Sequence, residues 1–490
     1  MSTPSENTKK ENKPSHFTTL KSKWIRFALW GTLTILFSIW TRSGWWLLGL
    51  PFFFDLYISR YLPWGFWKNS KNSTFKSVMD WVDAIVFALA AVYVINIYFF
   101  QNYQIPSSSL EKSLLVGDFL FVSKMSYGPR VPFTPLAFPL AQHTLPILNI
   151  KSYLENPHWN YKRVAGFGKV KRYDIVVFNF PAGDTVPVKQ VNPDYYTLCY
   201  SISKENNISR AEASQYVKNH PETFGEVVYR PVDRRENFVK RCIGLPGETL
   251  RIINNQVYIN GKIVPDQPGV QYNYFVQTKG SYISDDQFRK WGVSKDDRFM
   301  LEEGHPLVTL LSFRKNANGS VNPIYHFPAT KALIQTIRNS SAIDTVIIEP
   351  DAIKDYDLGG TTYPLNDRFK WTRDNYGPLW IPAKGSTITL TPDNIILYER
   401  VIRNYECQDL EIRNGIAFID GKKADKYTFH LDYYWMMGDN RHNSADCRAW
   451  GFVPEDHIVG KPICVWLSLD KDRSLFDGKI RWNRFFKKAY

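Results

Sequence analysis

Cysteine is scarce in this chain of 490 residues, and no two cysteines have the C-x-x-C spacing. The nine histidines do not cluster with them either. Structural zinc sites need Cys and His ligands at close spacing, so this pattern argues against a structural zinc. We expect no metal and no other cofactor. The odd number leaves at least one thiol unpaired and leaves one disulfide open. The five cysteines are Cys199, Cys242, Cys407, Cys447 and Cys464.

Acidic residues are too few to balance the basic ones. The chain has 47 Asp and Glu against 61 Lys and Arg, a formal net charge of +14. Much of the excess lies beside apolar stretches, where Lys and Arg face cytoplasmic lipid headgroups. No recognition-helix pattern and no aromatic-basic strand pair is present. We therefore expect a lipid bilayer, and no nucleic acid, as a partner.

Charge is absent from Ala84 to Phe100, within the strongest of three apolar stretches. Together these stretches predict a membrane region at 24–100 with about three transmembrane helices. The first two are short, so two spans or one hairpin that only dips into the bilayer would fit. The polar, lysine-rich segment 1–23 is expected to be a disordered cytoplasmic tail. The three stretches are Trp24–Trp40, Trp45–Ser59 and Trp81–Phe100.

The basic flanks predict the orientation. Both the tail before Trp24 and the segment Arg60–Lys76 are basic, and the second contains no acid. Positive flanks stay in the cytoplasm, so an even number of crossings separates them and the third stretch runs outward. Residues 101–490 are then expected on the outer, non-cytoplasmic side of the membrane.

Beyond Phe100, short β-branched and aromatic runs broken by Gly, Pro and Asn predict a mainly β domain. Two similar segments, 252–262 and 411–422, read as β-hairpins. The long polar stretches 184–236 and 265–384 look like insertions that form a large inserted lobe. The predicted strands are Phe119–Ser123, Asp174–Phe180, Phe238–Ile243, Thr249–Ile253, Gln256–Ile259, Thr387–Leu390, Ile395–Tyr398, Gly415–Ile419, Tyr434–Met437 and Lys461–Leu467.

Three motifs carry the candidate chemistry. Ser107–Ser109 follows the third apolar stretch, although serine clusters alone usually form turns or caps. Lys240 lies in an apolar strand, on the same face as Phe238 and Cys242. Burial there would lower its pKa far enough for a general base, while Arg241 would face solvent. The third motif, Tyr434–Pro454, is an apolar strand followed by a Gly-Asp-Asn turn.

In this order, and together with Gly117-Asp118 and Tyr173–Phe178, the motifs resemble type I signal peptidases (leader peptidases) over nearly all of the non-cytoplasmic part. The last motif is the most specific, running from Met-Met-Gly-Asp-Asn-Arg through Asn-Ser-x-Asp-x-Arg to Trp-Gly-Phe-Val-Pro. The resemblance implies a β-rich serine protease with a Ser/Lys dyad and without a metal. It also implies cleavage of signal peptides from exported preproteins that have small residues at the first and third positions before the cut.

Carried over by position, the resemblance assigns each candidate a role. Ser109, before Leu110, matches the nucleophile, and Lys240 matches the general base. The remaining matches are Ser107 with the oxyanion hole, Ser444 with a residue that hydrogen-bonds the lysine amine, and Asp446 with Arg448 as an acidic and basic pair that shapes the site.

The chain also departs from the family pattern. Lys112 stands where a proline stiffens the nucleophile loop, His442 where an acid is common, and Cys447 where a serine is common. Ser108 is expected to be a spacer. Lys124 is a competing base, disfavoured because Ser123 and Ser126 suggest an exposed edge.

A Ser/His/Asp arrangement is the other rival, but His442 and His457 are expected at the surface. Two further functions stay open: a catalytically inactive membrane-tethered binding or assembly module, and a Ser/Lys protease that cleaves itself as a regulatory switch.

Overall fold

The computed structural model describes residues 16–351, 361–413 and 415–489. The chain divides into two compact units, Met1–Val94 and Ile95–Tyr490. In the first unit, α1 (His16–Thr41) begins inside the segment predicted to be a disordered tail, and the rest of that tail lies outside the described residues. Two helices are long and apolar enough to cross a membrane, by length and composition: Lys21–Thr41 within α1, and α3 (Ser73–Tyr98).

The middle apolar stretch forms no third long helix. It breaks into a 3-10 turn (Gly44–Leu48), the short α2 (Gly49–Phe54) and a π turn (Asp55–Ser59). These pieces pack against α1, where Trp30 stacks on Phe53 at 5.4 Å between ring centroids and Phe37 meets Trp46 at 4.8 Å. The prediction of about three spans is therefore reduced to two candidate helices.

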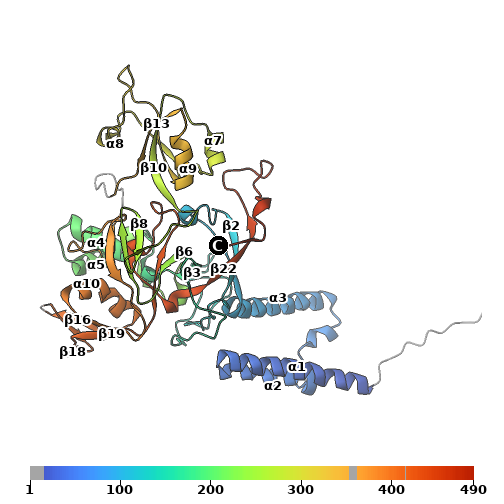
Figure 1. The fold of residues 1–490 in the computed structure, drawn as a ribbon. Coiled ribbons are helices and arrows are strands. Elements are labelled where there is room, and N and C mark those ends of the chain that lie inside the picture. Colours follow the sequence, from blue (N-terminus) through green and yellow to red (C-terminus); the bar gives the residue numbers. More distant parts are fainter. Residues whose placement is uncertain (1–15, 352–360, 414, 490) are drawn as a thin grey trace, which may run out of the picture. The chain divides into compact units, whose positions relative to one another are not determined.

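The second unit is β-rich, as predicted, and its main sheet crosses the centre of Figure 1. Neighbouring strands pair antiparallel in the order β1-β2-β22-β3-β6-β20-β21, with β23 paired to β22. The strands are β1 (Phe100–Gln104), β2 (Asp118–Ser123), β3 (Ile175–Asn179), β6 (Asn237–Gly244), β20 (Tyr433–Met437), β21 (Val453–Pro454), β22 (Ile458–Ser468) and β23 (Lys487–Lys488).

Smaller sheets surround the main one. The two predicted hairpins are confirmed as β7-β8-β9 and β16-β17-β18, and β14 joins the first of them beside β7. Their strands are β7 (Thr249–Ile253), β8 (Gln256–Ile259), β9 (Lys262–Ile263), β14 (Tyr376–Trp380), β16 (Leu410–Arg413), β17 (Ile416–Ile419) and β18 (Lys422–Lys423). Two further pairs are β4 (Thr185–Pro187) with β5 (Val227–Tyr229), and β15 (Thr387–Thr389) with β19 (Lys426–Thr428).

One predicted strand is wrong. Ile395–Tyr398 lies in α10 (Pro392–Arg400), since the side chain of Thr391 accepts a hydrogen bond from Asn394 N–H and Pro392 occupies the first helical position. A capping threonine followed by proline starts a helix, and this local signal outweighs the β-branched composition.

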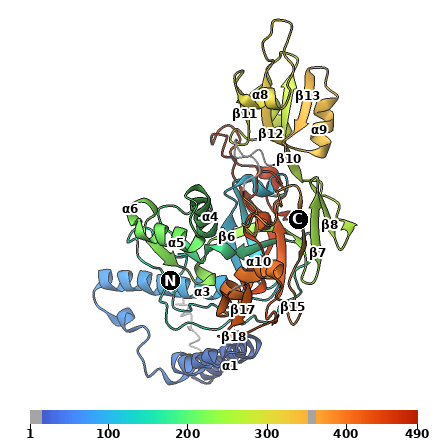
Figure 2. The same ribbon diagram turned by 90° about the vertical axis from the view of Figure 1, so that its left-hand side faces the viewer.

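Most of the two inserted stretches lies outside the main sheet, but the end of the second returns to the core, where β14 pairs with β7 and Tyr376 and Leu379 are buried. The first contains α4 (Tyr195–Glu205), α5 (Arg210–Asn219) and α6 (Pro221–Phe224). The second contains a four-stranded sheet in residues 271–348, hereafter the lobe, with its own buried cluster around Phe288 and Phe327. Figure 2 shows α8 and α9 beside the lobe strands. The lobe comprises β10 (Gln271–Thr278), β11 (Phe299–Leu301), β12 (Ile324–Thr330), β13 (Ile343–Ile348), α7 (Asp285–Trp291), α8 (Pro306–Leu310) and α9 (Lys331–Arg338).

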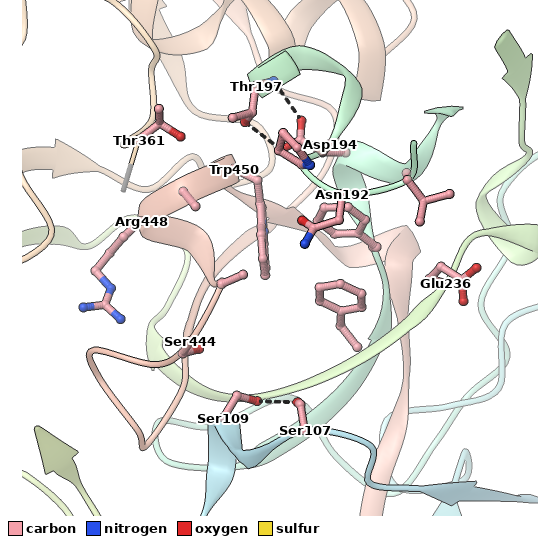
Figure 3. A pocket seen from close by; sticks show the side chains of 18 of the residues that line it. Ser107, Ser109, Asn192, Asp194, Thr197, Glu236, Thr361, Ser444, Arg448 and Trp450 are labelled. Carbon is pink, nitrogen blue, oxygen red and sulfur yellow. Dashed lines mark hydrogen bonds between the residues drawn. The ribbon is translucent and has the colours of Figure 1, made fainter. Parts of the chain in front are cut away.

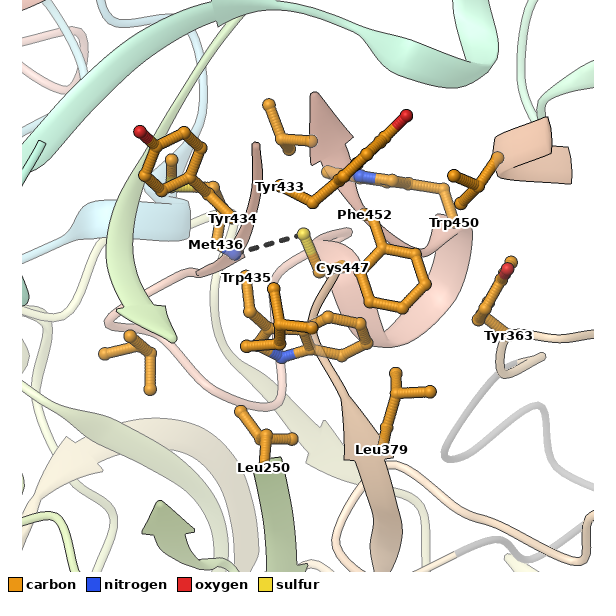
Figure 4. Close-up of a cluster of buried hydrophobic side chains, with 14 of the residues drawn as sticks. Leu250, Tyr363, Leu379, Tyr433, Tyr434, Trp435, Met436, Cys447, Trp450 and Phe452 are labelled. Atoms are coloured by element: carbon orange, nitrogen blue, oxygen red, sulfur yellow. Dashed lines mark hydrogen bonds between the residues drawn. The ribbon is translucent and has the colours of Figure 1, made fainter. Parts of the chain in front are cut away.

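The largest cluster of buried hydrophobic side chains includes residues of β6 and β20, and Figure 4 shows part of it. Trp435 is fully buried and contacts Tyr376 at 5.3 Å and Phe452 at 5.7 Å between ring centroids. The Met436 N–H donates to Cys447 Sγ across 3.1 Å, which fastens β20 to the short helix α11 (Cys447–Trp450). This packing fixes the backbone of β6, the strand that carries Lys240.

Candidate active site

Ser109 lies in a one-turn 3-10 helix, Ser108–Leu110, between β1 and β2. Leu110 is 1% exposed and packs into a second core with Leu114 and Leu120. The carbonyl of Ser109 accepts a hydrogen bond of 3.0 Å from the Asn440 N–H. An apolar anchor on one side and a main-chain bond on the other thus hold the Ser109 backbone, and its side chain is largely buried.

Lys240 comes from β6, between β3 and β20 in the main sheet. It is 5% exposed, and its Nζ lies 2.7 Å from Ser109 Oγ. Burial lowers the pKa of Lys240 to about 8, and the carboxylate of Asp446 partly offsets this effect. A lysine at its ordinary pKa is neutral in roughly one molecule in a few thousand at pH 7, whereas here the neutral fraction is about one in ten.

Ser107 and Ser444 lie beside this pair. Ser107 precedes this 3-10 helix, its Oγ lies 3.4 Å from Ser109 Oγ, and its side chain makes no capping hydrogen bond to the helix. Ser444 Oγ is buried and, in the described part of the chain, has no hydrogen-bond partner. The hydrogen bond expected between Ser444 and Lys240 is therefore not formed. A Cβ on Gly438 would collide with Ser444 Oγ and come within 2.7 Å of the Ser109 carbonyl oxygen, so this approach requires glycine.

Asp446 and Arg448 form the ion pair that the sequence suggested. Two hydrogen bonds join their side chains, from Arg448 Nε at 2.9 Å and Nη2 at 2.7 Å, and both side chains are buried. Burial opposes ionisation of Asp446, but the guanidinium and the Gly438 N–H hold the pKa of its carboxyl below the usual value. Asp446 therefore stays ionised and contributes negative charge near Lys240.

A second buried ion pair was missed at the sequence level. Arg241, which was expected to face solvent, is 4% exposed and donates to Asp439 from Nε at 2.8 Å and Nη2 at 2.6 Å. Ser113 Oγ donates to the same carboxylate at 2.6 Å. No local signal reveals this pair, because Arg241 and Asp439 are far apart in the sequence.

A pocket of about 880 Å³ opens onto these residues. Figure 3 shows Ser107, Ser109 and Ser444 close together in it, with Trp450 and Asn192 farther away. One part of the wall is apolar, with Phe180, Ala182, Val186, Phe238 and Trp450 among its residues; another part comes from the lobe and the segment after it. The arrangement leaves an extended space next to the Ser109 hydroxyl.

The rival candidates are Lys124, His442 and His457, and none of them hydrogen-bonds to Ser109 in the described part of the chain. Lys124 is not on an exposed edge: burial and the neighbouring Arg130 lower its pKa to about 7. Within the described residues its Nζ makes no hydrogen bond to a serine. The prediction of exposure failed because Lys124 directly follows β2 and is surrounded by arginine side chains.

His442 and His457 are buried, contrary to the surface positions expected. The His442 side chain lies 3.2 Å from Asp374 and 3.1 Å from Asn255, and burial lowers its pKa. His457 pairs with Asp456 at 2.6 Å. The partners of His442, Asp374 and Asn255, are distant in the sequence, whereas Asp456 directly precedes His457. In the described part of the chain, neither histidine hydrogen-bonds to Ser109.

The cysteines all have free thiols, so the disulfide left open by the sequence is not formed. Across residues 16–351, 361–413 and 415–489, no group of three or more His, Cys, Asp or Glu side chains could hold a metal ion.

Comparisons with known proteins give the family. The family model described as "Signal peptidase, peptidase S26" matches residues 78–306 and 385–467. The chain is 23% identical to a signal peptidase I of Buchnera aphidicola subsp. Acyrthosiphon pisum, over 85% of this chain and 83% of that protein. It is 21% identical to a signal peptidase I of Haemophilus influenzae, over 86% of this chain and 78% of that protein. The chain therefore belongs to the signal peptidase family, peptidase S26.

Proposed function

We propose that this protein is a signal peptidase I that cleaves signal peptides from exported preproteins with a Ser/Lys dyad. The observation that carries the proposal is the 2.7 Å separation of Lys240 Nζ from Ser109 Oγ in a buried site. A serine is a weak nucleophile at its free pKa and needs an adjacent base. Lys240 can act as that base, because burial lowers its pKa to about 8 and so raises the fraction of neutral amine near neutral pH.

In the first step the lone pair of neutral Lys240 takes the Ser109 hydroxyl proton while Oγ bonds to the scissile carbonyl carbon. The Ser107 hydroxyl donates a hydrogen bond to the resulting oxyanion. It can do so because it makes no capping hydrogen bond to the 3-10 helix and lies next to Ser109 Oγ. The Lys240 ammonium then returns the proton to the leaving amine as the C–N bond breaks. A water molecule, deprotonated by the same amine, hydrolyses the acyl-enzyme ester.

The other site residues act indirectly. Asp446 and Arg448 shape the wall beside Lys240, and the Ser444 hydroxyl, unpartnered in the described structure, is available to the Lys240 amine once it carries a proton. The apolar part of the pocket wall suits small residues before the cut, bound as an extended strand.

The same proposal includes membrane anchoring. α1 with the middle stretch and α3 would hold the chain in the inner membrane, with the basic segments before Trp24 and at Arg60–Lys76 on the cytoplasmic side. Residues 101–490 would then lie on the periplasmic side, where signal peptides of exported preproteins emerge.

Incubation of the purified full-length protein in detergent with a preprotein tests the proposal. We expect a mature fragment whose new amino terminus follows the signal peptide, no product with Ser109→Ala, and normal product with Ser320→Ala, a control at an exposed serine. Absence of product with the wild-type protein would favour the inactive binding module. Shortening of the enzyme's own chain without preprotein cleavage would favour the self-cleaving protease.

A further inference from the structure

The turn that carries Ser109 lacks the stiffening proline of the family, and its backbone could not hold one. Lys112 occupies that position with φ of 74°. Proline is locked near φ of −65°, so the left-handed conformation at Lys112 excludes it. A non-glycine residue pays for such a conformation and keeps it only when its surroundings hold it there.

The side chain of Lys112 finds its partners in the lobe. Its Nζ donates to the carbonyls of Trp291 at 2.8 Å and Gly292 at 2.7 Å. These carbonyls lie at the end of α7, where unpaired carbonyl groups and the helix dipole both favour a cation. Gly292 ends α7 in the left-handed conformation, with φ of 66°, which suits glycine at the end of a helix.

A second contact from the lobe lies on the other side of Ser109. Ser108, expected to be a spacer, donates from Oγ to Asp297 Oδ1 at 2.7 Å. The Asn443 amide donates to the same oxygen at 3.0 Å and to Ser108 Oγ at 3.1 Å. Ser294 donates to the other oxygen of Asp297 at 2.9 Å. Asp297 thereby joins the Ser109 turn to the loop that carries Ser444.

We propose that Lys112 and Asp297 are positioning residues, through which the lobe holds the Ser109 turn from both sides in place of the missing proline. The inference rests on the proposed function for its catalytic consequence, but the holding itself does not. Ser109 is flanked by Ser108 and Leu110, and each lobe contact lies within three positions of it. Displacement by about 1 Å of a reacting group can cost roughly a hundredfold in rate.

Lys112→Met keeps the aliphatic stem and removes the ammonium, and Asp297→Ala removes the acceptor of Ser108 and Asn443. Lys290→Met and Asp296→Ala alter exposed residues of the same segment and serve as controls. We expect kcat on a preprotein to fall about tenfold in each test variant with KM within about twofold, because misplacement of Ser109 affects chemistry more than binding. Lys112→Arg, which can still donate to both carbonyls, should retain most of the wild-type kcat.

Amide hydrogen exchange over residues 105–115 separates this inference from the proposed function. Faster exchange there in Lys112→Met and Asp297→Ala, but not in the two controls, supports the holding role whether or not any preprotein is cleaved. Lys112→Gly suits the backbone angle and should exchange as fast as Lys112→Met, which excludes backbone strain as the cause. Unchanged exchange in both test variants, or wild-type kcat with faster exchange, would overturn the proposal.

Discussion

Two lysines of the main sheet region are withdrawn from water, yet only one of them reaches a serine. Lys240 in β6 has a pKa lowered to about 8, and Lys124 after β2 has a pKa lowered to about 7. The Lys240 amine lies 2.7 Å from Ser109 Oγ. Lys124 is surrounded instead by Arg130, Arg163 and Arg234, which lower its pKa further.

The difference shows that a lowered pKa does not by itself identify a general base. Burial alone lowers the pKa of any lysine, because a low-dielectric surrounding disfavours the charged form. A base must also lie within hydrogen-bond reach of the proton that it removes. Lys240 meets both conditions. Its strand, β6, lies between β3 and β20 in the main sheet, and the Ser109 hydroxyl lies within hydrogen-bond distance of its amine.

The largest effect should come from replacing Lys240 with methionine, a residue of similar length. The same replacement at Lys124 gives the comparison. Lys240→Met should lower kcat/KM on a preprotein by about 10⁴-fold or more, since removal of the base of a catalytic pair has effects of this order. Lys124→Met should stay within about threefold, because a residue that contacts no reacting group changes rate little. Circular dichroism checks that both variants fold. Equal losses in the two would remove the distinction between them.

Position can be tested without touching either lysine. Gly438→Ala places a methyl group against Ser444 and the Ser109 carbonyl. We expect a loss of roughly a hundredfold in kcat from the resulting displacement. Gly304→Ala, where a Cβ meets nothing within 4 Å, should be neutral. The midpoint of the pH profile should not move in Gly438→Ala, whereas a shifted midpoint would mean that the burial of Lys240 had changed as well.

The pH dependence of the wild-type enzyme should follow Lys240. Only the neutral amine can accept the serine proton, so kcat/KM should rise about tenfold per pH unit below the pKa and level off above it. The midpoint is expected near pH 8. The Lys124→Met variant should give the same midpoint. If that variant displaced it, Lys124 would be the titrating base.

The smallest effect concerns the charge beside the base. The Asp446 carboxylate raises the pKa of Lys240, so Asp446→Asn should move the midpoint of the pH profile to lower pH. The same change leaves Arg448 buried without its partner, so the profile is measured well below the melting temperature. Asp420→Asn, at an exposed turn position, should not shift the midpoint. A shift to higher pH would contradict the assigned direction.

Local patterns predicted most strands of the main sheet and the two hairpins, because alternating polarity and Asn or Gly turns are signals within a few residues. They missed the four strands of the lobe, β10 to β13. The same approach failed at Ile395–Tyr398, where a capping threonine and a proline start a helix. It also failed for Arg241 and His442, since their partners Asp439 and Asp374 are distant in the chain. A charged side chain looks solvent-exposed in a sequence whenever its counterion is remote.

The sequence by itself determined the family motifs, the β-rich composition and the choice of Ser109 and Lys240 as candidates. It could not determine that Ser108 and Lys112 are tied to the lobe, because those bonds join residues about 180 or more positions apart. Nor could it distinguish Lys240 from the half-buried Lys124, since desolvation lowers the pKa of both. Only the tertiary structure decided these points, because hydrogen bonds and desolvation depend on which surfaces the fold brings together.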